Sequence, residues 1–410
     1  MKQSVRFCDA DQLDFETRLC LQQLLLCLHE FADRLESPSL SVPLLDEVNP
    51  PLWDFGHVAW FTEHWITRNS ARQEGVRQLT LERSPSVLKN ADHLFNSATI
   101  AHADRWQLDL LGVDGIREYL VNTFNSALNS LKEDRKTDSS LYFHRLCLAH
   151  AWMHIEAFQM NAQTLGIPLL TLQRSSESAA VVGKDSLFVS AQTVQFSPDK
   201  STFHFDNEAD ALTADMNAFE IDFRPISVSR YWEFVEHEGY LQRRHWSDEG
   251  WAWRQKSGAQ APLHFLKSEE GFRHRVGNHW QAVKPDAPAI HLSFFEAQAW
   301  CNWAGRRLPS EAEWMAAVDA GVEWGKVWEW TSSTFGPFPG FSPHPYQEYS
   351  KPWFKGHWVL KGASTMTNDL LRDPLLRNFY RPQRRDVFAG FRSVRAGNQG
   401  QAINSAKPFD

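Results

Sequence analysis

Two histidines spaced four residues apart carry the clearest chemical signal in this chain of 410 residues. In CLAHAWMHIEAF at 147–158, His150 and His154 lie one turn apart on a predicted helix, so their rings project from one face. His57 lies in another predicted helix among apolar residues, where an unpaired polar ring is costly. Three neutral imidazoles suit iron, zinc or copper and leave coordination positions open. The sequence therefore predicts a three-histidine metal site.

The same histidines also have a purely structural explanation. A pair of histidines four residues apart on a helix often arises by chance or serves in packing, and the chain has 17 histidines. The ligand set fits zinc as well as iron, so spacing alone does not name the metal. If the metal is bound, Glu63 and Glu156 are expected to accept hydrogen bonds from the ligand rings and to orient them.

The elements that must position these histidines are long helices. Apolar residues recur at intervals of three and four, which predicts helices at 11–38, 54–68, 114–133 and 138–165. Four such helices form a bundle. The polar segment 69–112 is long for a connection within a bundle, and we expect it to line a site.

The pattern changes after about residue 170. Residues 174–215 alternate short β-branched runs with polar turns, and beyond them only two helices are predicted, at 228–238 and 293–304. We therefore expect an α+β chain of two domains, a helical bundle over 1–172 and a loop-rich domain over 173–410.

Composition excludes several classes of function. The net charge is −8 and no local run of Lys or Arg compensates, so nucleic acid is not an expected partner. No stretch approaches the roughly 18 consecutive apolar residues of a membrane-spanning helix, and the first residues lack the pattern of a secretory signal. The five cysteines are scattered, which is typical of reduced thiols. We expect a cytoplasmic protein that acts on small molecules.

Several short sequence motifs, taken in order, resemble those of a known family. The first are W-D-F-G-H at 53–57 and the pattern His150-x-x-x-His154-x-Glu156. The others are FDNE at 205–208, HWSDEGWAWRQ at 245–255, APLHF at 261–265, WAGRRLPSEAEW at 303–314, VWEWTSS at 327–333 and FAGFR at 388–392. Over nearly its whole length the chain is thus similar to the ergothioneine-type sulfoxide synthases and the related selenoneine synthases. We interpret most of the later motifs as parts of the hydrophobic core of the second domain.

This resemblance implies a fold and a reaction. It implies a DinB-like four-helix bundle followed by a loop-rich domain like that of the formylglycine-generating enzymes, which is C-type-lectin-like. It also implies that His57, His150 and His154 hold Fe(II), with O2 as co-substrate. In HPYQEYSKPWF at 344–354, Tyr346 matches a family tyrosine that donates a proton or hydrogen atom, with Tyr349 supporting it. The other explanation of this pair is two packed loop tyrosines.

The substrates follow from the same resemblance. The family joins a sulfur or selenium donor to C2 of the imidazole of hercynine, which is N-trimethylhistidine. Its quaternary ammonium calls for aromatic faces, which residues around Phe379 are expected to supply, while Asn378 would bind the carboxylate.

The chain departs from the family at the donor pocket. The branch that uses γ-glutamylcysteine has an Arg-x-x-Arg pair where this chain has His102 and Arg105. It also has Asp where this chain has Tyr380, and Gln where it has Met153. Losing an Arg and an Asp suits a less charged donor than a zwitterionic dipeptide. A selenosugar donor, and hence a selenoneine synthase, is the favoured hypothesis.

Three alternatives stay open at this point. A sulfoxide synthase would use γ-glutamylcysteine or cysteine with the same metal and acceptor. A non-catalytic module would bind ligands in a Trp-lined pocket and keep the bundle histidines for packing. A zinc thiol transferase or hydrolase would use the bundle alone, without O2.

Overall fold

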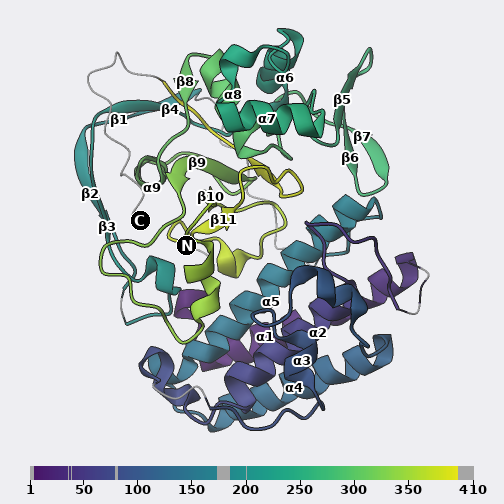
Figure 1. Cartoon of the computed structure of the whole chain (residues 1–410). Helices are drawn as coiled ribbons and strands as arrows, with labels where there is room; N and C mark the ends of the chain where they lie inside the picture. Colours follow the sequence, from purple (N-terminus) through teal and green to yellow (C-terminus); the bar gives the residue numbers. More distant parts are fainter. Residues whose placement is uncertain are drawn as a thin grey trace.

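The computed structural model describes residues 4–395 except 36, 38, 79–81, 173–184 and 200. Helices dominate its first region, and strands with shorter helices form the second (Figure 1). This arrangement confirms the expected α+β class. The expected boundary at 172/173 adjoins the segment 173–184, which lies outside the described residues.

Four long helices form the bundle: α1 (Ala10–Leu35), α2 (Pro51–Thr62), α4 (Val113–Glu133) and α5 (Asp138–Leu165). Both α1 and α2 pack against α4 and α5. α2 begins three residues earlier than predicted because Pro51 stands at its first turn, where a missing N–H costs nothing. Beyond Thr62 the chain continues as a π-helical turn, Glu63–Thr67.

α5 is the central helix of the molecule. Its start is capped by Thr137, whose side chain accepts from the Ser140 N–H, and its end is closed by Gly166 in the left-handed conformation. Most of its residues are buried on every side. Figure 1 shows why: α5 lies between the other bundle helices and the second region.

The long segment 69–112 folds back over α2. It contains the 3-10 turns η3 (Arg72–Arg77) and η4 (His102–Gln107) and the short helix α3 (Ala91–Phe95). α3 packs on α2, the helix of His57. Part of the segment 69–112 therefore lies beside the helix that carries His57.

The second region contains small sheets. One has the order β1-β4-β13-β8 and another β11-β10-β9-β12, with a hairpin β2-β3 and a meander β5-β6-β7. Their bounds are β1 Ser186–Val189, β2 Gln192–Phe196, β3 Leu212–Met216, β4 Phe219–Asp222, β5 Phe265–Ser268, β6 Gly271–Val276, β7 His279–Ala282, β8 Arg306–Arg307, β9 Trp328–Thr334, β10 Trp358–Gly362, β11 Asn378–Tyr380, β12 Ala389–Gly390 and β13 Val394–Arg395. In the second sheet β10 is antiparallel to β9 and β11, whereas β12 is parallel to β9.

The expectation of only two helices in the second region is wrong. The predicted pair is present as α6 (Val228–Glu236) and α8 (Phe294–Trp303), but α7 (Asp248–Ser257) and α9 (Glu311–Asp319) also form. Both additional helices begin after a serine whose side chain accepts a backbone N–H of the first turn.

A buried carboxylate joins the two regions. Glu156 on α5 accepts from Trp328 Nε1 at 2.8 Å and from Ser364 Oγ at 2.6 Å, both in the second region. This contact fixes the β9 end of the second sheet over the middle of α5. No helix among the described residues is long and apolar enough to cross a membrane.

Candidate metal centre

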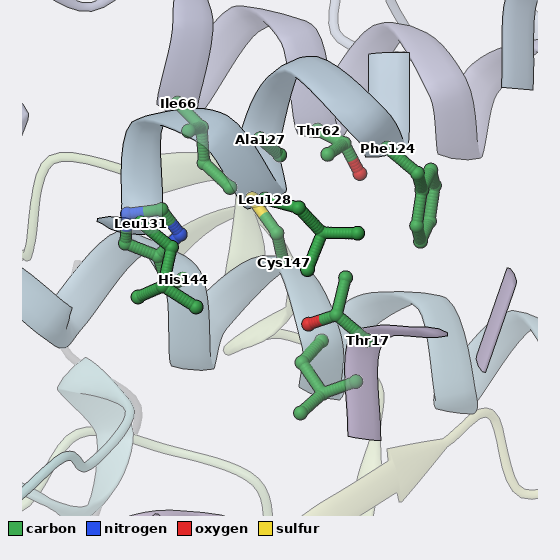
Figure 2. A pocket seen from close by; sticks show the side chains of 10 residues that line it. Thr17, Thr62, Ile66, Phe124, Ala127, Leu128, Leu131, His144 and Cys147 are labelled. Carbon is green, nitrogen blue, oxygen red and sulfur yellow. The ribbon is translucent and has the colours of Figure 1, made fainter. Parts of the chain in front are cut away.

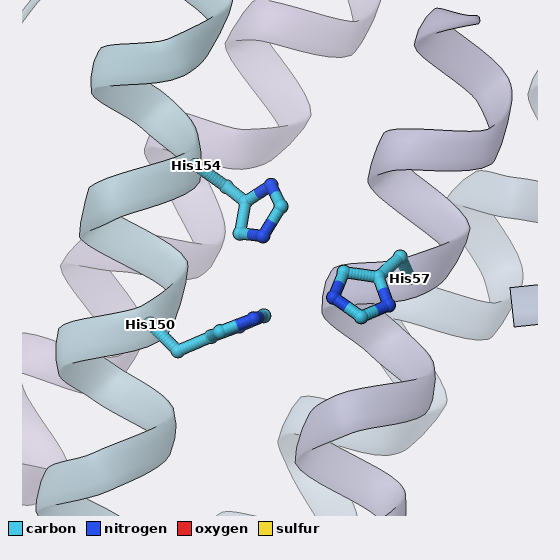
Figure 3. A group of neighbouring side chains, drawn as sticks. All are labelled: His57, His150 and His154. Carbon is cyan, nitrogen blue, oxygen red and sulfur yellow. The ribbon is translucent and has the colours of Figure 1, made fainter. Parts of the chain in front are cut away.

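The three predicted ligand histidines meet between two helices. α2 carries His57 and α5 carries His150 and His154, and one ring nitrogen from each lies within 4.8 Å of the others. Figure 3 shows the three rings turned toward one space between the helices. The four-residue spacing on α5 gives two neighbouring rings, and the antiparallel packing of α2 brings the third.

The orientation of the His57 ring is fixed by a backbone carbonyl. Its Nδ1 donates to the Phe95 carbonyl oxygen at 2.8 Å, and Phe95 is the last residue of α3. This contact is possible because Gly56 has no side chain: a Cβ there would lie 2.1 Å from the Phe95 ring. With Nδ1 engaged, Nε2 is the nitrogen left for a metal.

His154 has a buried carboxylate beside it. Asp54 Oδ1 lies 3.1 Å from His154 Nδ1, and only 1% of Asp54 is exposed. Burial acts to raise the pKa of Asp54, but the charge and hydrogen bond of His154 outweigh it and hold the pKa below its usual value. The ionised carboxylate is thus placed to orient the third ring and to offset part of a metal's charge.

His57 and His150 are neutral at physiological pH. Burial, with the neighbouring His154, lowers the pKa of His57 to about 3, and burial holds the pKa of His150 well below its usual value. His150 Nδ1 is buried with no hydrogen-bond partner among the described residues. An unpartnered buried nitrogen among clustered imidazoles is what a metal-binding site without its ion presents, so the donor set fits a cation that binds imidazole.

An aromatic wall connects the histidines to Tyr346. Phe61 stacks on His150 with ring centroids 3.7 Å apart and an interplanar angle of 8°. The Tyr346 ring lies 4.9 Å from Phe61 and 6.5 Å from His150. Burial raises the pKa of Tyr346, so its hydroxyl keeps its proton at neutral pH. The second region thus supplies a proton-bearing group beside the bundle histidines.

Tyr349 and Met153 also belong to this neighbourhood. The Tyr349 ring lies 6.0 Å from that of Tyr346, and its hydroxyl is 4.0 Å from Met153 Sδ. Met153 directly precedes His154 on α5. The sequence-predicted tyrosine pair, Met153 and the histidines therefore form one cluster.

Arg105 lies near His57, from which it is separated by the Trp53 ring, whereas His102 is directed elsewhere. The Arg105 guanidinium lies 3.8 Å above the Trp53 ring, and Trp53 stacks on His57 at 5.1 Å. His102 instead hydrogen-bonds the Val48 carbonyl oxygen through Nε2 at 2.9 Å. Its ring is therefore directed to the segment before α2 and not to the three histidines.

The residues of β11 separate onto two faces. Phe379 stacks on Phe335 with centroids 3.9 Å apart, so one face of its ring is already covered. Asn378 Oδ1 accepts from the Phe379 N–H at 2.9 Å. Tyr380 lies on the other face of the strand, together with Asn378. Burial raises the pKa of Tyr380, and the nearby Glu156 carboxylate raises it further.

The expectation that Glu63 and Glu156 orient the ligand rings is wrong. Glu63 instead accepts from Ser86, Tyr119 and a backbone N–H, and Glu156 joins the two regions. The residue that contacts a ligand ring is Asp54, which the sequence reading did not single out. Its place three residues before His57 puts both on one face of α2, and this spacing was the available signal.

A small pocket lies elsewhere in the bundle. Figure 2 shows its lining, which is mostly apolar and includes Thr62, Phe124 and Cys147. None of the three histidines of the cluster lines it. It is separate from the candidate metal centre.

Known proteins match the chain in two ways. Residues 173–324 match the family described as the sulfatase-modifying factor enzyme 1-like domain. The chain is 30% identical over 408 residues to the hercynine oxygenase of Mycolicibacterium thermoresistibile, with 84% of this chain and 87% of that protein covered. It is 29% identical to the hercynine oxygenase of Mycolicibacterium smegmatis, covering 84% of this chain and 90% of that one. The formylglycine-generating enzyme of Bos taurus is 30% identical over 130 residues, 29% of this chain and 35% of that protein.

Proposed function

Because the chain belongs to the hercynine oxygenase family and is an oxidoreductase, we propose that it joins a chalcogen donor to C2 of the hercynine imidazole, using iron(II) and O2. The observation that carries this proposal is the meeting of three ring nitrogens within 4.8 Å beside the partly buried Tyr346, whose ring lies 6.5 Å from that of His150. Family membership makes a non-catalytic binding module the weaker explanation.

His57, His150 and His154 would hold the iron. Iron(II) bound there would supply the one-electron chemistry with O2 that protein side chains lack. The chain's own contribution is to keep His57 and His150 neutral through burial and to orient His57 through the Phe95 carbonyl and His154 through Asp54.

Tyr346 would hold the transferable proton. Its raised pKa keeps hydrogen on Oη at neutral pH, and its ring packs against Phe61, which covers His150. Tyr349 would support the Tyr346 ring from the side away from α2. We propose both as functional residues, with Tyr346 as the donor.

The acceptor would bind between β11 and the bundle. The Asn378 amide is suited to the hercynine carboxylate, and aromatic rings are suited to its trimethylammonium group. One face of Phe379 is covered by Phe335, so its role would be shared with the Tyr349 ring, 6.0 Å away.

A selenosugar is the proposed donor, which makes the protein a selenoneine synthase. The donor side of the centre offers few charges: His102 is used by the Val48 carbonyl, Met153 is apolar, and Tyr380 is kept neutral by burial. A neutral sugar needs fewer ionic partners than a dipeptide with two carboxylates.

Thiols are the second donor class. Arg105 retains a guanidinium beside Trp53, and its Nε is buried with no hydrogen-bond partner among the described residues. A carboxylate of γ-glutamylcysteine or cysteine would satisfy that donor. The protein would then be an ergothioneine-type sulfoxide synthase.

The two regions would divide the work as two domains. We propose that residues 1–172 hold the iron and that residues 173–410 close the active site with Tyr346 and β11. The Glu156 contacts with Trp328 and Ser364 support this arrangement, because they fix the second region against the ligand-bearing helix.

The test begins with the apo-protein loaded with iron(II) under anaerobic conditions. O2 is then admitted with hercynine and, in parallel, selenoglucose, γ-glutamylcysteine or cysteine, and products are identified by mass spectrometry. A hercynine–selenium adduct that forms faster than any sulfur adduct supports the selenoneine assignment. A faster thiol adduct assigns the protein to the sulfoxide synthases. No adduct with any donor would contradict both and favour the non-catalytic binding module, and zinc chemistry on the bundle alone would likewise consume no O2.

A further inference from the structure

The segment that carries Tyr346 has little regular structure of its own. Between His344 and Ser350 the only element is the single 3-10 turn η7 (Gln347–Tyr349), and Pro345 directly precedes Tyr346. Three residues of 3-10 helix cannot fix the direction of a neighbouring side chain. The position of Tyr346 must therefore be set by contacts from elsewhere.

The turn η5 (Asp206–Glu208) binds the C-terminal end of this segment. Ser350 Oγ donates to Asp206 Oδ1, and Asn207 Nδ2 donates to the same Ser350 oxygen at 2.9 Å. Ser350 is 0% exposed, so water does not compete for its hydroxyl. Two side chains of one turn thus converge on one serine.

The same turn also acts on the N-terminal end of the segment. The backbone N–H of His344 interacts with the Asp206 carboxylate, which bridges two points six residues apart. The bundle also contacts this end, because the Tyr142 hydroxyl of α5 forms a hydrogen bond with His344 Nδ1 at 3.0 Å. Tyr346 lies between these two fixed ends.

The turn itself is anchored on further sides. Arg6 donates to Glu208 at 2.8 Å, and Arg377, the residue before β11, donates to the Asn207 carbonyl oxygen at 2.9 Å. Phe205, which caps the turn, stacks on Tyr349 with centroids 4.3 Å apart. A turn held in this way is a rigid support, and Asp206 and Asn207 are 3% and 2% exposed.

We propose that Asp206, Asn207 and Ser350 are positioning residues for the reaction: they hold the segment 344–350 so that Tyr346 stays beside the candidate metal centre. This inference rests on the proposed function of Tyr346 as the proton donor. It gives a role to the FDNE motif at 205–208, which the sequence alone predicts to be part of the hydrophobic core.

Ser350→Ala is the variant that tests it. The substitution removes one hydroxyl and adds no bulk, so the fold is expected to persist. We expect kcat for adduct formation to fall roughly tenfold to 100-fold, with iron content and KM for hercynine unchanged and more O2 consumed per adduct. The matched control is Ser342→Ala, an exposed serine two residues before His344, with kcat within about twofold of the parent.

A double-mutant cycle separates positioning from general damage. If Ser350 acts through Tyr346, the variant with both Ser350→Ala and Tyr346→Phe should be no slower than Tyr346→Phe alone. A further loss in the double variant, or full coupling in Ser350→Ala, would overturn the positioning role while leaving the proposed function intact. Unchanged turnover in Tyr346→Phe itself would overturn the proposed role of Tyr346 and this inference with it.

Discussion

Burial keeps the nitrogen lone pairs of His57 and His150, two of the proposed ligands, available for a metal. A protonated imidazole cannot coordinate, and His57 and His150 have pKa values lowered far enough to stay neutral throughout the physiological range. Their geometry complements this chemistry: Asp54 contacts Nδ1 of His154 and the Phe95 carbonyl contacts Nδ1 of His57, which leaves Nε2 of each ring for a metal.

His154→Ala is predicted to lose iron. Two imidazoles would remain on a site built for three, and Asp54 would be left as a buried carboxylate without its partner. We expect metal affinity to fall by roughly 100-fold or more, measured as iron content after desalting. His29→Ala, an exposed histidine on α1, is the control and should bind iron like the parent. Full occupancy in His154→Ala would remove this residue from the ligand set.

Tyr346→Phe is predicted to suppress adduct formation without releasing iron. The ring contact with Phe61 is kept and only the hydroxyl is lost, so the change isolates the proton. We expect roughly a 100-fold or greater decrease in kcat, measured by mass spectrometry of the product, with parental iron content. Iron loss in this variant would show instead that Tyr346 supports the site structurally.

At the scale of elements, the close approach of α3 to α2 determines how His57 is held. The carbonyl that orients the ring belongs to Phe95, and Phe95 reaches α2 only because Gly56 leaves room for its ring. A ligand's orientation is thus set by a glycine beside it in sequence and by a loop helix almost forty residues away.

Gly56→Ala is therefore predicted to weaken iron binding. The added Cβ would lie 2.1 Å from the Phe95 ring and must displace it, which lengthens the bond from His57. We expect a loss of about 1–3 kcal/mol in unfolding free energy and a roughly 10- to 100-fold weaker iron affinity, measured by denaturation and by metal titration. Gly336→Ala, where nothing lies within 4 Å of the new Cβ, is the control. Equal affinities in the two variants would contradict this account.

The sequence predicted the elements with strong periodicity and missed those without it. The bundle helices were found because apolar residues recur along them, and Gly166 marked the end of α5. α7 escaped because only Gly250 among its ten residues is buried, so no apolar stripe marks it. The helix α9 is not predicted because it is short and its first residues belong to the motif WAGRRLPSEAEW, which was interpreted as part of the core.

The partners of the ligand histidines were harder to predict than the histidines themselves. Spacing on one helix finds His150 and His154, but the contact of His57 with Phe95 depends on how the segment 69–112 folds back. The same folding takes Glu63 away, because Ser86 and Tyr119 bind its carboxylate. Such long-range contacts leave no local pattern.

At the scale of the whole molecule, buried neutral histidines make stability depend on pH. Besides the metal centre, His264, His274 and His291 cluster beside the β5–β7 meander, with His291 ring centroids 5.1 and 5.4 Å from the other two. Burial, with the neighbouring Arg275 and histidine rings, lowers the pKa of each to about 3. These groups are neutral when folded and free to ionise when unfolded.

The free energy of unfolding is predicted to fall as the pH drops below about 6.5. Folding lowers the pKa of each of these histidines, so at a pH below about 6.5 the unfolded chain binds more protons than the folded chain. The stability that is present above the pKa of the unfolded histidine is therefore lost as the pH falls toward the pKa of the folded one. Each histidine should contribute roughly 1.4 kcal/mol per pH unit in that window. Urea denaturation at pH 7.5, 6.0 and 5.0 measures how steeply the free energy of unfolding depends on pH. The variant His274→Gln should make this dependence less steep by the contribution of one histidine. A stability that does not change between pH 7.5 and 5.0 would contradict the burial of neutral rings.

The division of the centre between the two regions also has a consequence in time. The last of the three proposed ligand histidines is residue 154, whereas Tyr346 comes 192 residues later in the chain. At a ribosomal rate of about 5–20 residues per second, roughly 10–40 s pass between the synthesis of the last ligand and that of the tyrosine. During translation the nascent chain therefore carries all three proposed metal ligands before the proposed proton donor has been made.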